Sequence, residues 1–549
     1  MDDTFALISS SYGKNHFDID LPFQNILDFY YGKHLDLSEL GSYAGKELYE
    51  ATDYIDKLSS PQEKMWGITD GRIDSILISP MEKSILKKLI LDFGINRPYA
   101  HGRQLMEHYA MGYLVADPGI YCIITLTNQT LYALHKYGNS KFNKEVKALS
   151  GDGPDLWLGA TWFTERQGGS DLGANDTQAV FHNGKWLLTG DKYFASNAGL
   201  ADISLISAFH DGNKGARNLS IFALKRKNDD NALNYRVRRL KEKSATKSVP
   251  SGEVELDNSE AIMLGDRGSG IYYITEDLMV SRLDNAAAAC GIARKAYLEA
   301  YYYSQKRMAF GKYLISHPGV KKDLLDMEVM LEGSLALTFK SIKHFQQSIE
   351  SKPPYDDDYN YTRLLTHIVK NLTADSSASI TKNATELHGG IGFLSEFPIE
   401  RWHREALITP IWEGASNIQA LDMLEAIFKK NAHKKLLKDF RNIVDEIKDG
   451  RDEAEADYTI LNDSIEKLLK YSADEAQFYS KNLMAKMGNS MASILLIEIG
   501  NRTLNDRYIT SGIMYYQRFV KNEDYGVEMI ERADSIIHID KISEFIKNR

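Results

Sequence analysis

The sequence predicts a mainly α-helical α+β protein in which a small antiparallel β domain separates helical regions. Apolar residues recur at helical intervals in the first 150 residues and again after about residue 270. Between these regions, short strand patterns alternate with turn signals. A chain of 549 residues is too long for one core. We therefore expect an N-terminal helical domain (1–150), a middle β domain (151–265), a C-terminal four-helix bundle (266–430) and an additional helical domain (431–549).

Composition and charge describe an ordinary globular protein. Hydrophobic residues make up 43% and charged residues 26% of the chain, and the net charge of −10 gives no general attraction to nucleic acid. Cys122 and Cys290 are too far apart to suggest a metal site or a disulfide framework, which fits a reducing compartment. The N-terminus is acidic where a signal peptide would be basic, and no apolar run approaches about 18 residues. We expect a cytoplasmic protein with no membrane span and no metal site.

The first 150 residues contain the patterns of several helices. Positions such as Ile85, Leu89, Leu105 and Tyr109 recur at helical spacing, and a further apolar helix is expected over 124–137. Gly138 and Asn139 can end that helix with a left-handed residue.

The middle region has strand patterns at 155–163, 179–181, 186–188, 203–209, 219–224, 235–240 and 253–256. His182-Asn183-Gly184 is a good hairpin turn. Parallel strands usually need helical crossovers, for which this region has no room, so an antiparallel sheet or barrel is expected.

Two stretches of the β region favour a ligand with many hydrogen-bond acceptors. In the first, Thr164 is followed by a glycine pair and Ser170, so that hydroxyls and backbone N–H groups can face a flavin or a phosphate. In the second, Phe194 and Ser196 share one face of a strand and can lie along a ring system. A surface loop and a half-buried core strand are the alternatives.

The region after residue 270 predicts four helices, over 279–306, from 320 onward, over 361–387 and over 417–429, which suits an up-and-down bundle. Glu413 lies just before the last of them, between Trp412 and Gly414, where a carboxylate can be partly desolvated and its pKa raised. Upstream, the Gly389-Gly390 pair allows close approach of backbone to a ligand. The alternative is a loop with a solvated glutamate.

Five segments resemble those of the acyl-CoA dehydrogenase family, and they occur in the family's order. They are TERQGGSD (164–171), KYFAS (192–196), RMAFGKYLISHP (307–318), ELHGGIGF (386–393) and IWEGASNIQ (411–419). The stretch 240–253, Trp412 and the long C-terminal extension further resemble the branch that contains the alkylation-response protein AidB.

The resemblance implies the family's fold and an FAD enzyme that converts an acyl-CoA to a trans-2-enoyl thioester. Glu413 would remove the α proton, and the β hydride would pass to the flavin N5. The residues implied in cofactor binding are Phe163, Thr164, Gly169, Ser170, Phe194, Ser196, Arg307, Phe310, His317, Glu386, Gly389, Gly390, Ser416 and Asn417. Those implied in substrate binding are Ser170, Arg282, Trp412 and Gly414.

The implied partners are an acyl-CoA substrate, an electron-transferring flavoprotein as acceptor, and further copies of the chain in a homodimer or homotetramer. Four positions depart from the family pattern: Phe194 stands where tryptophan is usual, Pro318 stands where glutamine often contributes an amide, and Ala415 and Trp412 differ as well. Ala415 replaces a threonine whose hydroxyl commonly contacts the cofactor, and Trp412 replaces a tyrosine, which should narrow the acyl entrance.

The last segment, 431–549, predicts helices docked by an apolar face. Ile465, Leu468, Ala476, Leu483 and Met487 recur at helical spacing; a surface for a partner or a membrane is the alternative. The segment carries 18 Lys and Arg against 21 Asp and Glu, so nucleic acid is not an expected ligand. The alternative function is an AidB-like flavoprotein that binds and protects nucleic acid with little dehydrogenase turnover.

Overall fold

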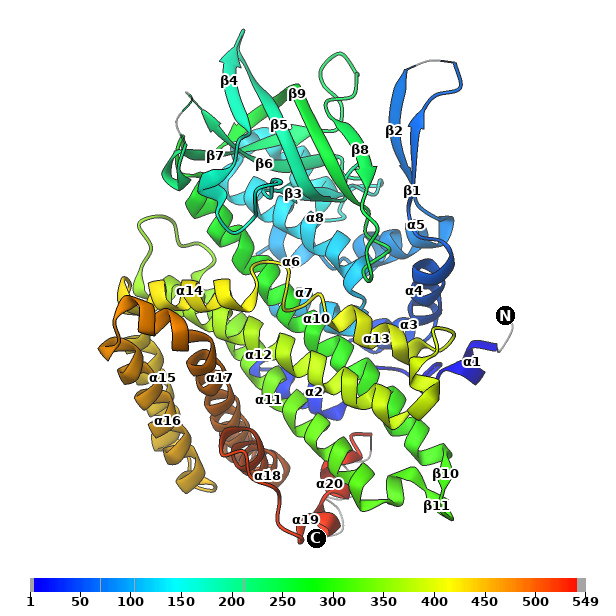
Figure 1. Cartoon of the computed structure of the whole chain (residues 1–549), viewed down its shortest axis with the longest axis vertical. Coiled ribbons are helices and arrows are strands. Elements are labelled where there is room, and N and C mark those ends of the chain that lie inside the picture. Colours follow the sequence, from blue (N-terminus) through cyan, green and yellow to red (C-terminus); the bar gives the residue numbers. More distant parts are fainter. Residues whose placement is uncertain (1–3, 70, 103, 211, 213, 541–549) are drawn as a thin grey trace. The chain divides into compact units, whose positions relative to one another are not determined.

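The computed structural model describes residues 4–69, 71–102, 104–210, 212 and 214–540. The chain divides into two compact units (Figure 1). We call them the sheet unit, Glu50–His108 and Asp117–Ser281, and the helical unit, Met1–Tyr49, Tyr109–Ala116 and Arg282–Arg549. The first 150 residues thus contribute to both units.

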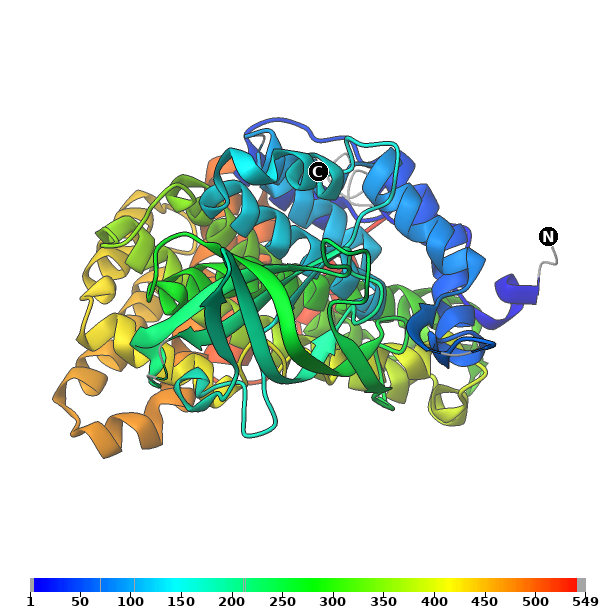
Figure 2. The ribbon, with the colours of Figure 1, turned by 90° about the horizontal axis from the view of Figure 1, so that it is seen from above.

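A seven-stranded sheet forms the centre of the sheet unit, and Figure 2 shows its strands in green and teal. Its strands are β3 (Gly159–Trp162), β4 (Gln178–His182), β5 (Lys185–Ser196), β6 (Ile203–His210), β7 (Leu219–Lys225), β8 (Arg236–Leu240) and β9 (Ser251–Leu264). Five strands pair in the order β6-β4-β5-β9-β7, and they close into a ring because β7 also pairs with β6. The other two strands pair with members of this ring, β3 with β6 and β8 with β9. Trp162, Leu188, Ile206, Phe222 and Val254 are among its buried core residues.

The prediction of a purely antiparallel sheet is wrong at two pairings. β3 pairs with β6 in parallel along its whole length, and β4 pairs with β6 in parallel at Gln178 and Ala179. No helical crossover is needed, because the β4–β5 hairpin itself occupies the connection from β3 to β6. The predicted turn of that hairpin is confirmed: Asn183 and Gly184 have φ of +49° and +81°, as a type I′ turn requires.

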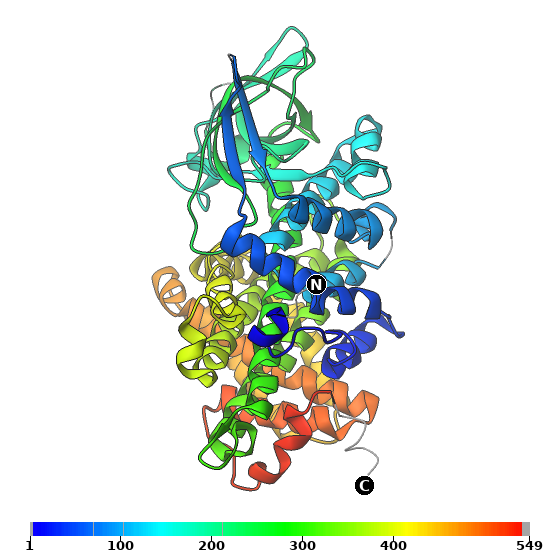
Figure 3. The ribbon, with the colours of Figure 1, turned by 90° about the vertical axis from the view of Figure 1, so that its right-hand side faces the viewer.

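The sheet unit also contains a hairpin that the sequence pattern did not predict, formed by β1 (Gln62–Trp66) and β2 (Arg72–Leu77) (Figure 3). The first strand begins with three polar residues, and its half-buried positions are Glu63 and Met65, so its sequence lacks the apolar alternation that identifies a half-buried strand. Arg72 anchors the hairpin by donating to the Val237 carbonyl oxygen of β8, 2.7 Å away.

Helices complete the sheet unit or cross its borders. They are α4 (Glu47–Leu58), α5 (Pro80–Lys87), η1 (Lys88–Asp92), α6 (Arg97–Ala100), α7 (Met106–Val115), α8 (Pro118–Tyr137), η2 (Asn139–Phe142), α9 (Asn143–Leu149), η3 (Leu172–Ala174) and η4 (Ala216–Asn218). The predicted apolar helix is α8, whose first turn is fixed by the Asp117 cap and by Pro118. Asn139, at φ +56°, is the left-handed residue that follows it.

The helical unit contains the four predicted bundle helices α10 (Gly270–Lys306), α11 (Pro318–Ser348), α12 (Asp357–Leu387) and α14 (Ser416–Phe428). The first twelve residues of α10 belong to the sheet unit. Shorter elements of the helical unit are α1 (Thr4–Ile8), α2 (Leu21–Tyr31), α3 (Ser38–Gly45), β10 (Met308–Ala309), β11 (Lys312–Tyr313), η5 (Leu314–Ser316), η6 (Gly389–Phe393) and α13 (Pro398–Ala406).

The C-terminal extension adds α15 (Ala432–Glu446), α16 (Arg451–Lys470), α17 (Ala473–Thr503), α18 (Asp506–Tyr515), η7 (Tyr516–Val520), α19 (Met529–Arg532) and α20 (Asp534–Ile537). The apolar positions from Ile465 to Met487 lie in two helices, α16 and α17. The chain breaks at Ser472, which caps α17 in a reciprocal capping box with Glu475. The Ser-x-x-Glu pattern is the sequence signal for this start.

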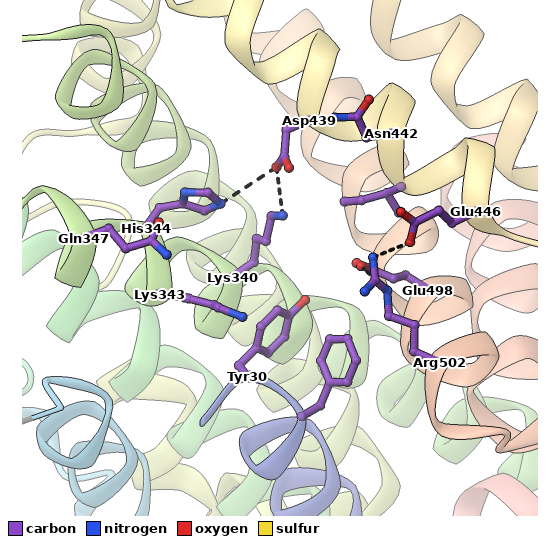
Figure 4. A pocket seen from close by; sticks show the side chains of 12 residues that line it. Tyr30, Lys340, Lys343, His344, Gln347, Asp439, Asn442, Glu446, Glu498 and Arg502 are labelled. Carbon is purple, nitrogen blue, oxygen red and sulfur yellow. Dashed lines mark hydrogen bonds and ion pairs between the residues drawn. The ribbon is translucent and has the colours of Figure 1, made fainter. Parts of the chain in front are cut away.

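The extension docks on the bundle, since α17 packs against α11, α12 and α14. A polar pocket of about 260 Å³ lies among α2, α11, α15 and α17 (Figure 4). Its opposite charges pair with one another: Lys340 Nζ lies 2.8 Å from Asp439, and Arg502 lies 2.8 Å from Glu446. Among the residues described, no helix combines the length and apolar character that a membrane span needs.

Candidate active site

A buried ion pair holds the loop 164–171 of the sheet unit in place. The Glu165 carboxylate accepts hydrogen bonds from Lys192 Nζ at 2.7 Å, Thr177 Oγ1 at 2.6 Å and the Asp176 N–H at 2.6 Å. Lys192 also donates to the Ser207 carbonyl oxygen at 2.9 Å. Burial acts to raise the pKa of Glu165, but Lys192 and the hydrogen bonds outweigh it, so the pKa lies below its ordinary value. The loop is therefore fixed to β5 and β6.

The predicted residues of this loop present hydroxyl groups on a tight backbone. Phe163 is buried, Thr164 is half-buried and Ser170 is exposed. A Cβ at Gly169 would lie 2.5 Å from Thr164 Oγ1, so only glycine fits there without displacing that hydroxyl. The hydroxyl groups of Thr164 and Ser170 can donate hydrogen bonds to the acceptor atoms of a flavin or a phosphate.

On β5, Phe194 is 55% exposed and Ser196 is half-buried, with Ser196 Oγ 2.9 Å from Ser251 Oγ. Strict alternation would put Lys192 on the face of Phe194, yet Lys192 is buried, because the register with β9 shifts between Lys192 and Ala195. The Lys241 ammonium lies 4.8 Å from the centre of the Phe194 ring. The sheet unit thus presents an exposed aromatic ring at Phe194 and a half-buried hydroxyl at Ser196 on the same strand.

In the helical unit, the predicted cofactor segments present exposed groups. Arg307 is exposed, Phe310 is 97% exposed, and His317 Nε2 lies 3.0 Å from the Ala309 carbonyl oxygen. At Gly389 and Gly390 a Cβ would meet nothing within 4 Å. The exposed Glu386 carboxylate pairs with Lys382 at 2.7 Å.

Glu413 lies in a strained turn between α13 and α14. Its φ of +56° is in the left-handed region, which costs a residue with a Cβ about 1–3 kcal/mol, and Gly414 follows at +93°. Such a conformation persists only where the surroundings hold it.

Three buried side chains hold this turn through its carbonyl oxygens. Arg282 Nε donates to the Glu413 oxygen at 2.9 Å, and Lys370 Nζ donates to the Gly414 oxygen at 2.8 Å. Gln419 Nε2 donates to both oxygens at 2.9 Å. We call Arg282, Lys370 and Gln419 the carbonyl clamp. It fixes the backbone that carries the Glu413 side chain, which is half-buried.

Further buried groups orient the clamp. Asp422 lies 3.2 Å from Arg282, and the His367 Nδ1–H donates to Gln419 Oε1 at 2.9 Å. Burial lowers the pKa of His367 to about 3, so its ring is neutral near pH 7. Burial, followed by repulsion from Arg282, lowers the pKa of Lys370 to about 7, and the Glu413 charge acts in the opposite direction.

The remaining predicted residues lie on either side of the turn. Trp412 Nε1 donates to Asn285 Oδ1 of α10, which fixes the indole. Ser416 is buried at the start of α14, and Asn417 is exposed. Ala415 is the N-cap residue and makes no side-chain cap hydrogen bond, as its missing hydroxyl requires.

Sequence reasoning brought Glu413, Gly414 and Arg282 into one candidate site, and the helical unit places them together. It expected Arg282 near a substrate, whereas the guanidinium binds the Glu413 carbonyl oxygen and Asp422. It missed Lys370, which is fully buried in α12. The local sequence carried little signal, because Lys370 follows only two apolar residues, Ile368 and Val369, and is followed by Asn371.

Comparisons with known proteins agree with these segments. The model of the acyl-CoA dehydrogenase middle domain matches residues 160–259, and that of the C-terminal domain matches residues 268–428. The chain is 34% identical over 322 residues to acyl-CoA dehydrogenase family member 11 of Caenorhabditis elegans, covering 56% of this chain and 52% of the relative. It is 33% identical over 270 residues to AidB of Escherichia coli, covering 49% and 48%. The chain therefore spans about half the length of these two relatives.

The fold is shared over a greater length. The structure of ACDH-11 of Caenorhabditis elegans in complex with C11-CoA superposes with a TM-score of 0.83 at 24% identity, over 96% of this chain and 95% of that one. Because the match covers 96% of this chain, the shared fold includes most of the C-terminal extension.

A third relative in sequence is matched over more of its own length than the first two. The short-chain-specific acyl-CoA dehydrogenase of Clostridium acetobutylicum is 30% identical over 275 residues, which cover 50% of this chain and 69% of that enzyme. With both domain models matched in order, the chain belongs to the acyl-CoA dehydrogenase family.

Proposed function

We propose that this protein is an FAD-dependent acyl-CoA dehydrogenase in which Glu413 removes the α proton of an acyl-CoA. The observation that carries the proposal is the carbonyl clamp, which holds a glutamate in a left-handed turn within the family's catalytic segment. Strain maintained by three buried donors is expected where the position of one side chain matters for chemistry.

The residues present fit FAD. In the sheet unit, we assign Phe163, Thr164, Gly169, Ser170, Phe194 and Ser196 to the cofactor, because they offer hydroxyl donors and an exposed ring. In the helical unit, we assign Arg307, Phe310, His317, Glu386, Gly389, Gly390, Ser416 and Asn417. The exposed Arg307 guanidinium suits a pyrophosphate. When bound, FAD supplies the acceptor for the hydride that leaves the β carbon.

The carbonyl clamp holds the backbone of Glu413 in place, which favours a role for this residue as a general base. Because the Glu413 carbonyl oxygen accepts hydrogen bonds from Arg282 and Gln419, the turn cannot rotate without breaking those bonds, and the direction of the Cα–Cβ bond of Glu413 is fixed. The carboxylate accepts the α proton, and the Glu413 N–H stabilises negative charge on the thioester oxygen. The product is a trans-2-enoyl thioester.

Further assignments concern specificity and partners. The fixed Trp412 indole narrows the acyl entrance, and Ser170, Arg282 and Gly414 complete the substrate set, with Arg282 acting through the turn. We assign an electron-transferring flavoprotein as the electron acceptor and a homo-oligomer as the assembly.

The test is stopped-flow flavin reduction without oxygen, with a panel of acyl-CoAs, on the wild type and on Glu413→Gln. The amide keeps the size of the side chain but cannot accept the α proton, so the rate should fall by at least ~10²–10⁴-fold while FAD stays bound. Glu400→Gln is the matched control: the same change on α13, where Glu400 pairs with Arg404 at 3.1 Å. A Glu413→Gln variant that bleaches within a few-fold of the wild-type rate would remove Glu413 from the mechanism.

A further inference from the structure

Lys370 is a fully buried lysine whose ammonium donates to the backbone directly after the proposed base. It lies on α12 and reaches the Gly414 carbonyl oxygen at 2.8 Å. No carboxylate of the described residues lies within ion-pair distance of it. The clamp member Arg282, by contrast, has Asp422 at 3.2 Å. The Gly414 carbonyl oxygen is thus the main partner of this buried ammonium group.

The charged groups around Lys370 come from several elements. Arg282 of α10 repels the ammonium, while Glu413 of the turn and Asp375 of α12 attract it. Asp422 of α14 acts on Arg282, and Lys481 of α17 acts on Asp375. The Glu413 charge thus stabilises the ammonium form of Lys370, and the Coulomb attraction between the two groups is mutual.

We propose that Lys370 is a positioning residue whose ammonium holds the Glu413 turn in the reactive geometry, so that loss of its proton slows proton abstraction. The inference rests on the proposed function of Glu413. A charged donor makes a hydrogen bond roughly twice as strong as a neutral one. The neutral amine therefore holds the Gly414 oxygen less firmly and no longer attracts Glu413.

The pH range follows from the burial. Because burial lowers the pKa of Lys370 to about 7, the ammonium is present below that pH and is lost above it. The rate of flavin reduction should fall as the pH rises through about 7. Stability should change in the opposite direction: between about pH 7 and the ordinary pKa of 10.5 the unfolded chain binds more protons, so the free energy of unfolding increases with pH.

The experiment compares wild type, Lys370→Met and Lys370→Arg as FAD-loaded protein, from pH 6 to pH 9. Flavin reduction and the urea midpoint of unfolding are both measured. Lys370→Met should reduce flavin ~10²-fold more slowly at pH 6, because a small displacement of a catalytic group costs about that much. Its urea midpoint at pH 6 should equal or exceed that of the wild type. Lys370→Arg keeps a charge at all these pH values, so its rate should not fall above pH 7.

Lys481→Met is the matched control, since it removes a lysine that acts on Asp375, and it should keep the wild-type pH profile. A wild-type rate that stays level across pH 7 would overturn the proposal. So would a Lys370→Met variant that loses rate and urea midpoint together, which is the result of a merely structural role.

The two proposals fail differently. If Glu413→Gln reduces flavin at the wild-type rate, the proposed function fails, and the inference on Lys370 fails with it. If Glu413→Gln is inactive while the Lys370 variants keep the wild-type profile, only the inference on Lys370 is wrong.

Discussion

Replacing Gly414 with alanine tests whether the carbonyl clamp serves catalysis or only folding. Gly414 has φ +93°, and a Cβ there would lie 2.8 Å from Gln419 Nε2 and 3.3 Å from the Arg282 guanidinium. The side-chain end of Gln419 can move, but only by giving up its bonds to the two carbonyl oxygens. The substitution therefore adds backbone strain and loosens the clamp.

The magnitude follows from these two parts. A left-handed conformation costs an L-residue roughly 1–2 kcal/mol, and each hydrogen bond lost from Gln419 costs about 1 kcal/mol net. We expect the free energy of unfolding to fall by about 2–4 kcal/mol. Because the base is displaced as well, the rate of flavin reduction should fall by ~10²-fold.

Gly32→Ala is the matched control. Gly32 has a similar φ of +84° at the end of α2, and a Cβ there would meet nothing within 4 Å. It should lose only the roughly 1–2 kcal/mol of strain and keep the wild-type rate. Urea unfolding and stopped-flow flavin reduction measure both quantities. If Gly414→Ala loses stability but reduces flavin as fast as Gly32→Ala does, the clamp does not position the base.

Three further predictions concern the cofactor, the flavin loop and nucleic acid. Arg307→Ala should weaken FAD retention, measured as flavin absorbance after gel filtration, because it removes a charge-assisted contact to pyrophosphate; unchanged retention would exclude Arg307 from the site. Lys192→Met leaves Glu165 buried without its ion-pair partner and should lower the free energy of unfolding by about 3–5 kcal/mol; a loss below about 1 kcal/mol would contradict the buried pair. Duplex DNA should bind weakly at physiological salt, since arginines of the extension such as Arg441 and Arg502 pair with carboxylates. A sub-micromolar complex that weakens steeply with salt would instead favour the AidB-like alternative.

Local features of this protein follow from the sequence. The turn at Asn183 and Gly184 needs two left-handed residues in a row, and the sequence supplies residue types that tolerate them. The cap at Asp117 and the capping box at Ser472 likewise depend on residues within a few positions of each other. The segments that we propose for the cofactor and the base are equally local, because each is a short run of residues.

Only the tertiary structure decided which distant residues meet. Arg282 and Lys370 lie 131 and 44 positions from the carbonyl oxygens that they bind, and neither spacing carries a periodic signal. The parallel pairing of β3 with β6 depends on where the β4–β5 hairpin folds, not on the pattern of either strand. The sequence by itself therefore determined which residues can do the chemistry. The packing of α10, α12 and α14 determined how Glu413 is held, because hydrogen bonds between helices depend on how those helices pack rather than on the order of residues within one of them.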